Sequence, residues 1–194
     1  MPPHHTPPRP AGPMTDLEWN ALAPYILWHG AGRPVENLRA RIDGIFWIAA
    51  TGRPWKDLPQ SFGTADTVSR HFRRLTARHL WQRLLHALAA PGAPAALLAL
   101  EPWICRACHR AVRLAGLSLI VTARRLGFRS ALRGPSWMLP DPDLSETILR
   151  VTEHWLQRLS QDPDAPPQGI FALCGRLLAT AGGRRRIPRC LWPA

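Results

Sequence analysis

Apolar residues recur at helical spacing up to about position 90 of this chain of 194 residues. The longest such stretch covers about 35–51, where apolar residues follow one another at intervals of three or four: Leu38, Ile42, Ile45 and Ile48. That spacing lines one face of an α-helix, whereas a half-buried strand would alternate apolar and polar residues. A chain with this pattern has to pack helices against one another, and we predict a mainly α fold.

Helix signals divide this part of the chain into four helices. Thr15 and Glu18 have the spacing of a capping box, which starts the first helix. Gly52 ends the second helix, because glycine adopts the left-handed conformation that often closes a helix. The remaining predicted elements are one helical turn at 55–59, a helix that opens at Thr64, and a helix over about 77–89.

Proline and glycine set the predicted domain organisation. Residues 1–13 are proline-rich, and we expect them to be disordered and dispensable for folding. Residues 14–90 are expected to form one helix-turn-helix-like domain, which ends at the PGAP run of 91–94. The tail, 91–194, is rich in arginine, proline and alanine, and is either a partly ordered helical segment or a decayed or out-of-frame remnant. Helical patterns occur in it at 95–116, 143–160 and 169–181, and a strand is an alternative at 117–121.

The charge of the chain favours a polyanionic partner, since the formal net charge is +12 and the pI is about 11.4. Nucleic acid is the commonest partner of this kind, and an anionic membrane surface is the second. Arginine bias in a GC-rich genome would produce a similar composition. No stretch reaches the roughly 18 apolar residues of a membrane span, and the start does not have the pattern of a signal peptide. We therefore expect a cytoplasmic protein without a membrane partner.

Residues 51–75 combine a short helical turn, a glycine-containing connector and a longer helix, which is the pattern of a helix-turn-helix. Val68, Phe72 and Leu75 would pack inward on the longer helix. Its opposite side would then carry Thr67, Arg70, His71, Arg73 and Arg74. Arginine can bind guanine edges or phosphates, and hydroxyl groups can reach either. The alternative is a basic helix face that is only solvated.

Longer motifs surround this helix in a recognisable order. They are a T-D-x-x-W start at Thr15, Gly-Arg-Pro at 32–34, Ile-Phe-Trp at 45–47, T-G-R-P-W-K-D-L-P at 51–59, Phe-Gly at 62–63 and T-V-S-R-H-F-R-R at 67–74. Their order and spacing resemble the N-terminal domain of insertion-sequence transposases of the IS-five type, over about two-fifths of the chain. The resemblance implies a helical domain that binds double-stranded DNA at the ends of the insertion element.

The predicted DNA-binding residues come from this helix and from neighbouring loops: Arg33, Arg53, Lys56, Thr67, Ser69, Arg70, Arg73 and Arg74. We assign Arg70 and Thr67 to base edges. The remaining basic residues are assigned to phosphates, which fix the position of a protein on DNA without reading its sequence.

The resemblance does not extend to a catalytic domain. In that family a ribonuclease-H-like domain follows, in which three acidic residues hold two magnesium ions. Here Glu101 is the sole acidic residue between Asp66 and Asp141. We therefore expect a truncated transposase-like protein with no catalytic residues and no strand-transfer activity. The alternative is a non-catalytic interaction or regulatory protein that pairs with itself or with a full-length transposase.

Cys105, Cys108 and His109 form a C-x-x-C-H match, which is the attachment signature of c-type haem. Haem attachment needs export, and the match lies in an arginine-rich stretch that is compatible with a helix. A zinc site that adds Cys174 and Cys190 is a second alternative, but these two are too far apart for a knuckle pair. Buried thiols are the interpretation we favour, so no cofactor and no metal ligand is predicted.

Overall fold

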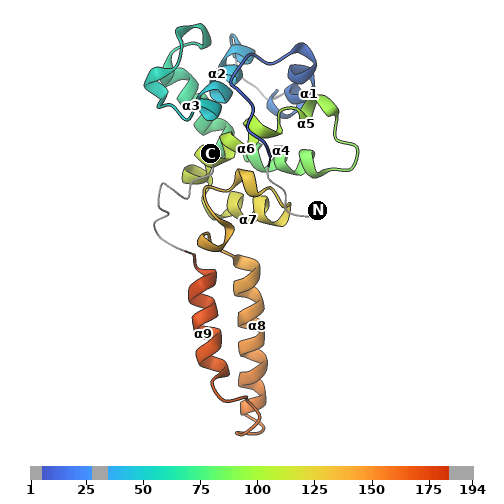
Figure 1. Cartoon of the computed structure of the whole chain (residues 1–194), viewed down its shortest axis with the longest axis vertical. Helices are drawn as coiled ribbons and strands as arrows, with labels where there is room; N and C mark the ends of the chain where they lie inside the picture. Colours follow the sequence, from blue (N-terminus) through green and yellow to red (C-terminus); the bar gives the residue numbers. More distant parts are fainter. Residues whose placement is uncertain (1–5, 28–34, 184–194) are drawn as a thin grey trace. The chain divides into compact units, whose positions relative to one another are not determined.

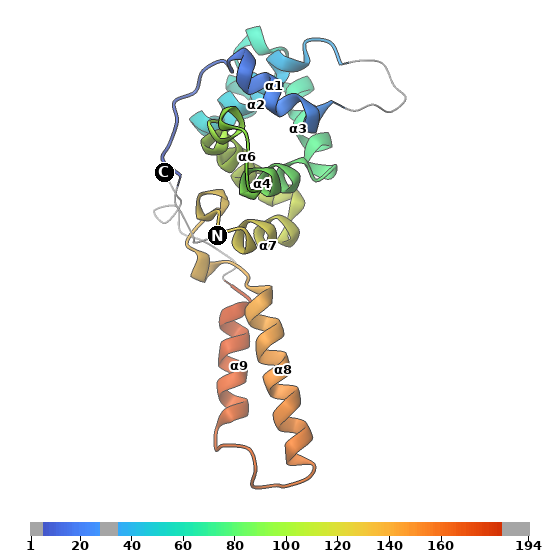
Figure 2. The ribbon, with the colours of Figure 1, turned by 90° about the vertical axis from the view of Figure 1, so that its right-hand side faces the viewer.

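The computed structural model describes residues 6–27 and 35–183, and within these ranges its regular structure is helical, without strands (Figures 1 and 2). This confirms the predicted mainly α fold. The chain forms two compact units, of which the first runs to Arg133 and the second begins at Gly134.

The first unit contains most of the helices. Its elements are α1 (Asp16–Ile26), α2 (Leu38–Thr51), the 3-10 turns η1 (Trp55–Asp57) and η2 (Gln60–Phe62), α3 (Ala65–Ala77), α4 (Leu80–Ala89), α5 (Ala95–Leu98), α6 (Glu101–Ala115), α7 (Leu117–Arg125) and the 3-10 turn η3 (Arg129–Ala131). The second unit contains the 3-10 turn η4 (Ser136–Met138), α8 (Pro142–Leu159) and α9 (Ile170–Ala181).

The predicted helix signals act as expected. The Thr15 hydroxyl accepts a hydrogen bond from the Glu18 amide at 3.3 Å, and the Glu18 carboxylate accepts one from the Thr15 amide at 2.8 Å. This reciprocal pair satisfies two amides that the first turn of α1 would otherwise leave without partners. Gly52 closes α2 with a φ of 69°, a conformation in which any side chain would be strained.

Helix α6 is the centre of the first unit, where it packs against α2, α3, α4 and α7. Trp103 is 1% exposed, and its ring centroid lies 5.7 Å from that of Phe46 on α2. Cys105 and Cys108 are buried in the same core, as the sequence interpretation favoured. Burial raises the pKa of the Cys105 thiol to about 12, so this group stays protonated near neutral pH.

The division of the chain into two compact units does not fall at the predicted boundary of 91–94. The PGAP run is a tight turn, in which Gly92 has a φ of 79° and the Ala93 amide donates to the Ala90 carbonyl. The chain then returns to the same core, because α6 covers the apolar faces that α2, α3 and α4 present to it. The segment 117–121, for which a strand was an alternative, is helical and belongs to α7.

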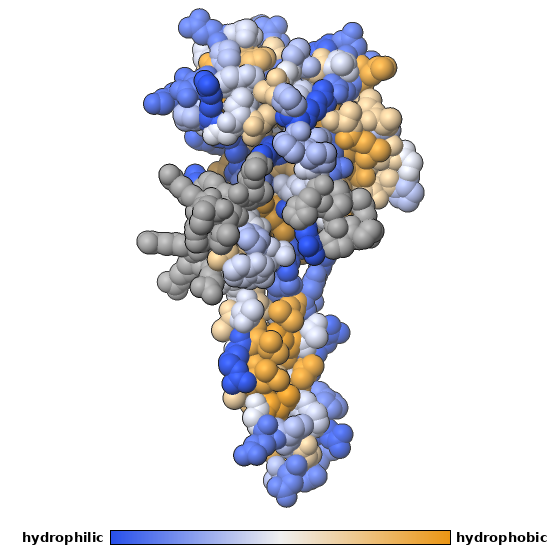
Figure 3. Space-filling view, in the orientation of Figure 1, coloured by the Kyte–Doolittle hydropathy of each residue, from blue (hydrophilic) through white to orange (hydrophobic). Residues whose placement is uncertain are grey.

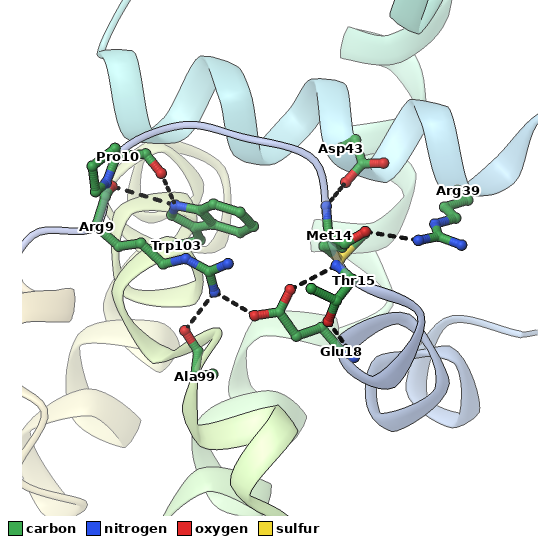
Figure 4. Close-up of polar contacts among 9 residues, drawn as sticks. All are labelled: Arg9, Pro10, Met14, Thr15, Glu18, Arg39, Asp43, Ala99 and Trp103. Carbon is green, nitrogen blue, oxygen red and sulfur yellow. Dashed lines mark hydrogen bonds and ion pairs between the residues drawn. The ribbon is translucent and has the colours of Figure 1, made fainter.

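Of the segment 1–13, for which disorder was predicted, residues 1–5 lie outside the described residues, and Arg9 and Pro10 contact the first unit (Figure 4). The Arg9 guanidinium donates to the Glu18 carboxylate at 2.6 Å and to the Ala99 carbonyl at 2.9 Å. It also lies 3.9 Å from the centroid of the Trp103 ring, whose indole nitrogen donates to the Pro10 carbonyl at 3.1 Å. The segment is held because it covers a large aromatic side chain and supplies acceptors for its N–H group.

Two buried carboxylates fix the entry to α1. The Met14 amide donates to Asp43 on α2 at 3.0 Å, and Arg39 donates to the Met14 carbonyl at 2.7 Å (Figure 4). Burial raises the pKa of Asp43. The hydrogen bond from the Met14 amide acts in the opposite direction, because it favours the ionised carboxylate. Burial also opposes ionisation of Glu18, but hydrogen bonds from Arg9 and Thr15 outweigh it and hold the Glu18 pKa below its ordinary value.

The second unit contains a helical hairpin of α8 and α9, close to the helices predicted over 143–160 and 169–181. Its small core consists of Ile148, Cys174 and Ala181, against which Leu144, Ile170 and Leu178 pack. The Asp141 side chain caps α8 through the Leu144 amide, while the Asp141 amide donates to the Ala181 carbonyl at 2.8 Å. Figure 3 shows an apolar area along this hairpin. Within the described ranges, no helix has the length and apolar character needed to cross a membrane.

We predict that limited proteolysis of the full chain leaves a resistant fragment that ends near Arg133. The reason is that α6 belongs to the same core as α2, α3 and α4, so a cut near position 90 requires that core to open. Mass spectrometry of the fragments measures this. A separately expressed fragment 6–133 should unfold cooperatively, whereas a fragment 14–90 should not. A first stable product that ends near position 90 would contradict the arrangement.

We predict that Arg9→Ala lowers the free energy of unfolding by about 1–3 kcal/mol, because a partly buried charge-assisted hydrogen bond to Glu18 is lost. Urea unfolding of the full chain measures the effect. Lys56→Ala, a change at an exposed position, is the control and should stay close to the parent. An Arg9→Ala variant that is as stable as the control would show that the contacts of the Arg9 side chain do not stabilise the first unit.

Candidate nucleic-acid interface

Helix α3 has an apolar face and a basic face. Val68, Phe72 and Leu75 are buried, with exposed fractions of 0%, 3% and 4%, which confirms the predicted inward face. The exposed side of the helix carries the predicted arginines Arg70, Arg73 and Arg74. The sequence pattern was sufficient to predict both sides of α3, because the apolar spacing of a helix indicates which side is buried and which is exposed.

A chain of aromatic contacts fixes the neighbours of α3. The Trp55 and Phe72 ring centroids lie 5.5 Å apart, and those of Phe72 and Trp81 lie 5.4 Å apart. The Trp81 indole donates to the Thr76 hydroxyl at 2.8 Å, so α3 is joined to η1 on one side and to α4 on the other. These contacts place Lys56, which lies in η1 and is exposed, in the segment that packs on α3.

The close approach of η2 to α2 requires a glycine. A Cβ atom added at Gly44 would lie 2.8 Å from the Cβ atom of Phe62, which is too close for a real contact. Gly44 therefore lets the connector before α3 pack directly on α2. This packing sets the position at which α3 begins.

The start of α3 carries a hydroxyl pair. The Thr64 side chain caps the helix by accepting from the Thr67 amide at 3.4 Å, and its hydroxyl donates to the Thr67 hydroxyl oxygen at 2.8 Å. Thr67 is half-buried, and Arg70 forms an ion pair with Asp66, in which both side chains are about two-thirds exposed. Exposed pairs of this kind contribute about 0–1 kcal/mol. Arg70 can therefore exchange Asp66 for another anion at little cost.

Two residues that were predicted to lie on the outer side of α3 or near its boundary are buried. Ser69, a predicted DNA-binding residue, is 7% exposed, and its hydroxyl donates to the Asp66 carbonyl at 3.1 Å. His71 is 6% exposed. Both corrections have the same cause, since α3 is covered by α2 and also by α6, so its buried face is wider than its apolar spacing indicates. Arg33, which was predicted to bind phosphate, lies outside the residues that the structure describes.

The His71 side chain is held neutral inside the molecule. Its Nε2 atom is buried and has no hydrogen-bond partner in the described part of the chain. Burial lowers the His71 pKa to about 4, and the positive charges of Arg74, Arg41 and Arg78 act in the same direction. His71 therefore contributes no positive charge to the surface near neutral pH.

The sequence analysis missed Arg110, which lies on α6 in the segment that was predicted to be a separate tail. Its guanidinium donates to the Arg53 carbonyl and lies 5.3 Å from the Trp55 ring centroid. The Arg53 guanidinium lies 5.8 Å from the Trp47 ring centroid. Arg110 on α6 therefore fixes the loop that carries Arg53, a predicted phosphate-binding residue. The signal in the sequence that could have identified Arg110 was the regular spacing of arginines along an otherwise apolar helix.

The side chains of the described residues do not gather into a metal site. In the ranges 6–27 and 35–183, no three or more histidine, cysteine or acidic side chains come together in a way that could hold a metal ion. His109 lies beside the two core cysteines in sequence, and burial lowers its pKa to about 4, with Arg106 contributing.

We predict that acid destabilises the first unit through His71. Since the pKa of His71 is about 4 in the folded state and near 6.5 when exposed, the unfolded state binds more protons between these values. Stability is then complete above about pH 6.5 and is lost as the pH falls toward 4, by up to about 1.4 kcal/mol per pH unit for each such histidine.

His71→Leu should make this loss shallower, while the contribution of His109 remains. Urea unfolding of both proteins at several pH values between 4 and 7 measures the two slopes. Equal slopes in the parent and in His71→Leu would show that His71 titrates normally in the folded chain.

Comparisons with known proteins agree with the sequence motifs. Residues 14–85 match the family model described as "putative transposase of IS4/5 family". This range covers α1, α2 and α3 and ends within α4. No solved structure matches the chain.

A curated protein of Sinorhizobium fredii, printed as "Uncharacterized protein y4sN", is 27% identical to this chain over 78 residues. The similar region is 39% of this chain and 62% of that protein, so the chain spans about three-fifths of the length of the relative. The N-terminal region of the chain, residues 14–85, thus matches the family of IS4/5 transposase-like proteins, as its motifs predicted.

Proposed function

We propose that the first unit binds double-stranded DNA, with α3 as the recognition helix. The observation that carries this proposal is the coincidence of the family match over residues 14–85 with the exposed arginines of α3. The aromatic contacts of Trp55, Phe72 and Trp81 support it, because they hold the loop that carries Arg53 and Lys56 beside the same helix.

In this proposal the exposed residues have two roles. Arg70 leaves its exposed partner Asp66 and binds a base edge in the major groove, where its planar donors suit guanine. Thr67, at the start of the helix, also binds a base edge. Arg73, Arg74, Arg53 and Lys56 bind phosphates and fix the orientation of the helix on the duplex. The turns η1 and η2 together with α3 would then act as a helix-turn-helix.

We further propose that the residues of this chain bind DNA without cutting or joining it, as a transposase-like protein in the cytoplasm. The sequence supports this, since Glu101 is the only acidic residue between Asp66 and Asp141. Incubation with a duplex that carries inverted repeats, in the presence of Mg²⁺ or Mn²⁺, tests the proposal. Reproducible nicking that is lost in Asp141→Asn would overturn it.

A second candidate function is protein association, with another copy or with a full-length transposase. One observation favours it: α8 and α9 bury few residues against each other and leave large apolar side chains exposed. These are Leu149, Val151, Leu156, Leu159, Phe171, Leu173 and Leu177. Sedimentation of the chain over a range of concentrations tests for self-association, which a strictly monomeric chain would argue against.

We predict that the triple variant Arg70→Ala, Arg73→Ala and Arg74→Ala loses most of its affinity for a DNA site selected from a random pool. Two lost phosphate contacts should reduce the slope of log affinity against log salt by about two. The lost base contact should cost about 1–3 kcal/mol on the preferred site and nothing on other sequences. Gel-shift titrations at several salt concentrations measure both effects.

A charge-matched control is available in the second unit. Arg150, Arg158 and Arg176 are exposed and lie on α8 and α9, so their triple alanine variant removes the same charge from another part of the chain. This control should bind the selected site with nearly parental affinity. An equal loss in both triple variants, with folding intact, would show that binding arises from net charge alone.

A further inference from the structure

Helix α6 is buried on most of its surface and keeps one basic stripe. Its buried residues are Trp103, Ile104, Cys105, Ala107, Cys108 and Ala111. Arg106 and Arg110 are half-buried and Arg113 is exposed. Their spacing of four and three residues places these three arginines on one side of the helix, over about 10 Å of its axis. We call them the α6 stripe.

The α6 stripe adjoins the loop that follows α2. Arg110, in the middle of the stripe, donates to the Arg53 carbonyl and lies against the ring of Trp55. Arg53 and Lys56 are exposed in this loop. The basic residues of α6 and those of the loop therefore lie next to one another, although the sequence separates them by some fifty positions and the family match ends before α6.

The electrostatic surroundings of the stripe favour an anion. No acidic residue occurs in the sequence between Glu101 and Asp141, whereas that stretch contains seven arginines: Arg106, Arg110, Arg113, Arg124, Arg125, Arg129 and Arg133. Burial lowers the pKa of Arg110, and the charge of Arg113 lowers it further. Burial likewise lowers the pKa of Arg133, again with a contribution from Arg113. An anion bound near Arg113 would reduce this repulsion.

We propose that the α6 stripe is a second phosphate-binding site, which holds the DNA backbone beside the part of the duplex that α3 reads. Arginine suits this role, because its planar guanidinium can donate two hydrogen bonds to one phosphate and stays charged when partly buried. Arg113 is the outermost contact and Arg110 connects the site to the Arg53 loop. The inference rests on the proposed DNA-binding function, and it assigns part of that function to residues beyond position 85.

The test compares the full chain with the variant Arg106→Gln and Arg113→Gln on one duplex of about 30 base pairs that contains the selected site. Arg110 is left unchanged because it also fixes the Arg53 loop. Losing two phosphate contacts should lower the slope of log affinity against log salt by about two, and the preference for the selected site over a scrambled one should not change. The matched control is Arg150→Gln and Arg158→Gln on α8, which should retain the parental slope.

The single variant Arg113→Gln removes an exposed side chain and keeps the test decisive if the double variant fails to fold. It should lower the salt slope by about one. Parental slopes in the α6 variants, together with a reduced slope in the α3 triple variant, would overturn the second site and leave the proposed function standing. A reduced slope in the α6 variants, with parental binding in the α3 triple variant, would support the site and overturn the assignment of α3. A full chain that binds no duplex would overturn both.

Discussion

The packing of α6 against α2 is the contact on which the first unit depends. Trp103 brings the largest apolar surface of α6 against Phe46, and both side chains are almost completely buried. The same helix also contacts α3, α4 and α7, so four helices of the first unit share one partner. Apolar area removed from water is the main stabilising contribution in such a core. Removing α6 would expose the inner faces of the helices that carry the family motifs.

Two carboxylates serve as hydrogen-bond acceptors inside the first unit. Glu18 and Asp43 are buried, where they accept hydrogen bonds from Arg9, Thr15 and Met14. Acidic side chains that serve as acceptors inside the fold cannot neutralise arginines outside it. His71 is buried as a neutral group because α3 is covered by both α2 and α6. The arginines of α3 and α6 contribute part of the positive charge that remains outside.

The first unit ends at Arg133 and thus extends beyond the range of the family match. Residues 14–85 contain α3, the proposed recognition helix, and the loop with Arg53 and Lys56. Arg110, which fixes that loop through a backbone carbonyl and the Trp55 ring, lies outside the match. The proposed function therefore relies on tertiary contacts that a match to the N-terminal region does not include. The hairpin of α8 and α9 adds a unit whose exposed apolar residues suit association.

Local patterns in the sequence were enough to predict the helices of the first ninety residues, the cap at Thr15, the end of α2 at Gly52 and the inward face of α3. These features depend on hydrogen bonds and spacings within a few residues, which a local pattern can express. Tertiary structure alone decided that Ser69 is buried, that residues 6–13 cover Trp103, and that the unit continues past the PGAP turn. Each of these depends on a partner far away in the sequence, and local patterns contain no information on which distant surface will cover a residue.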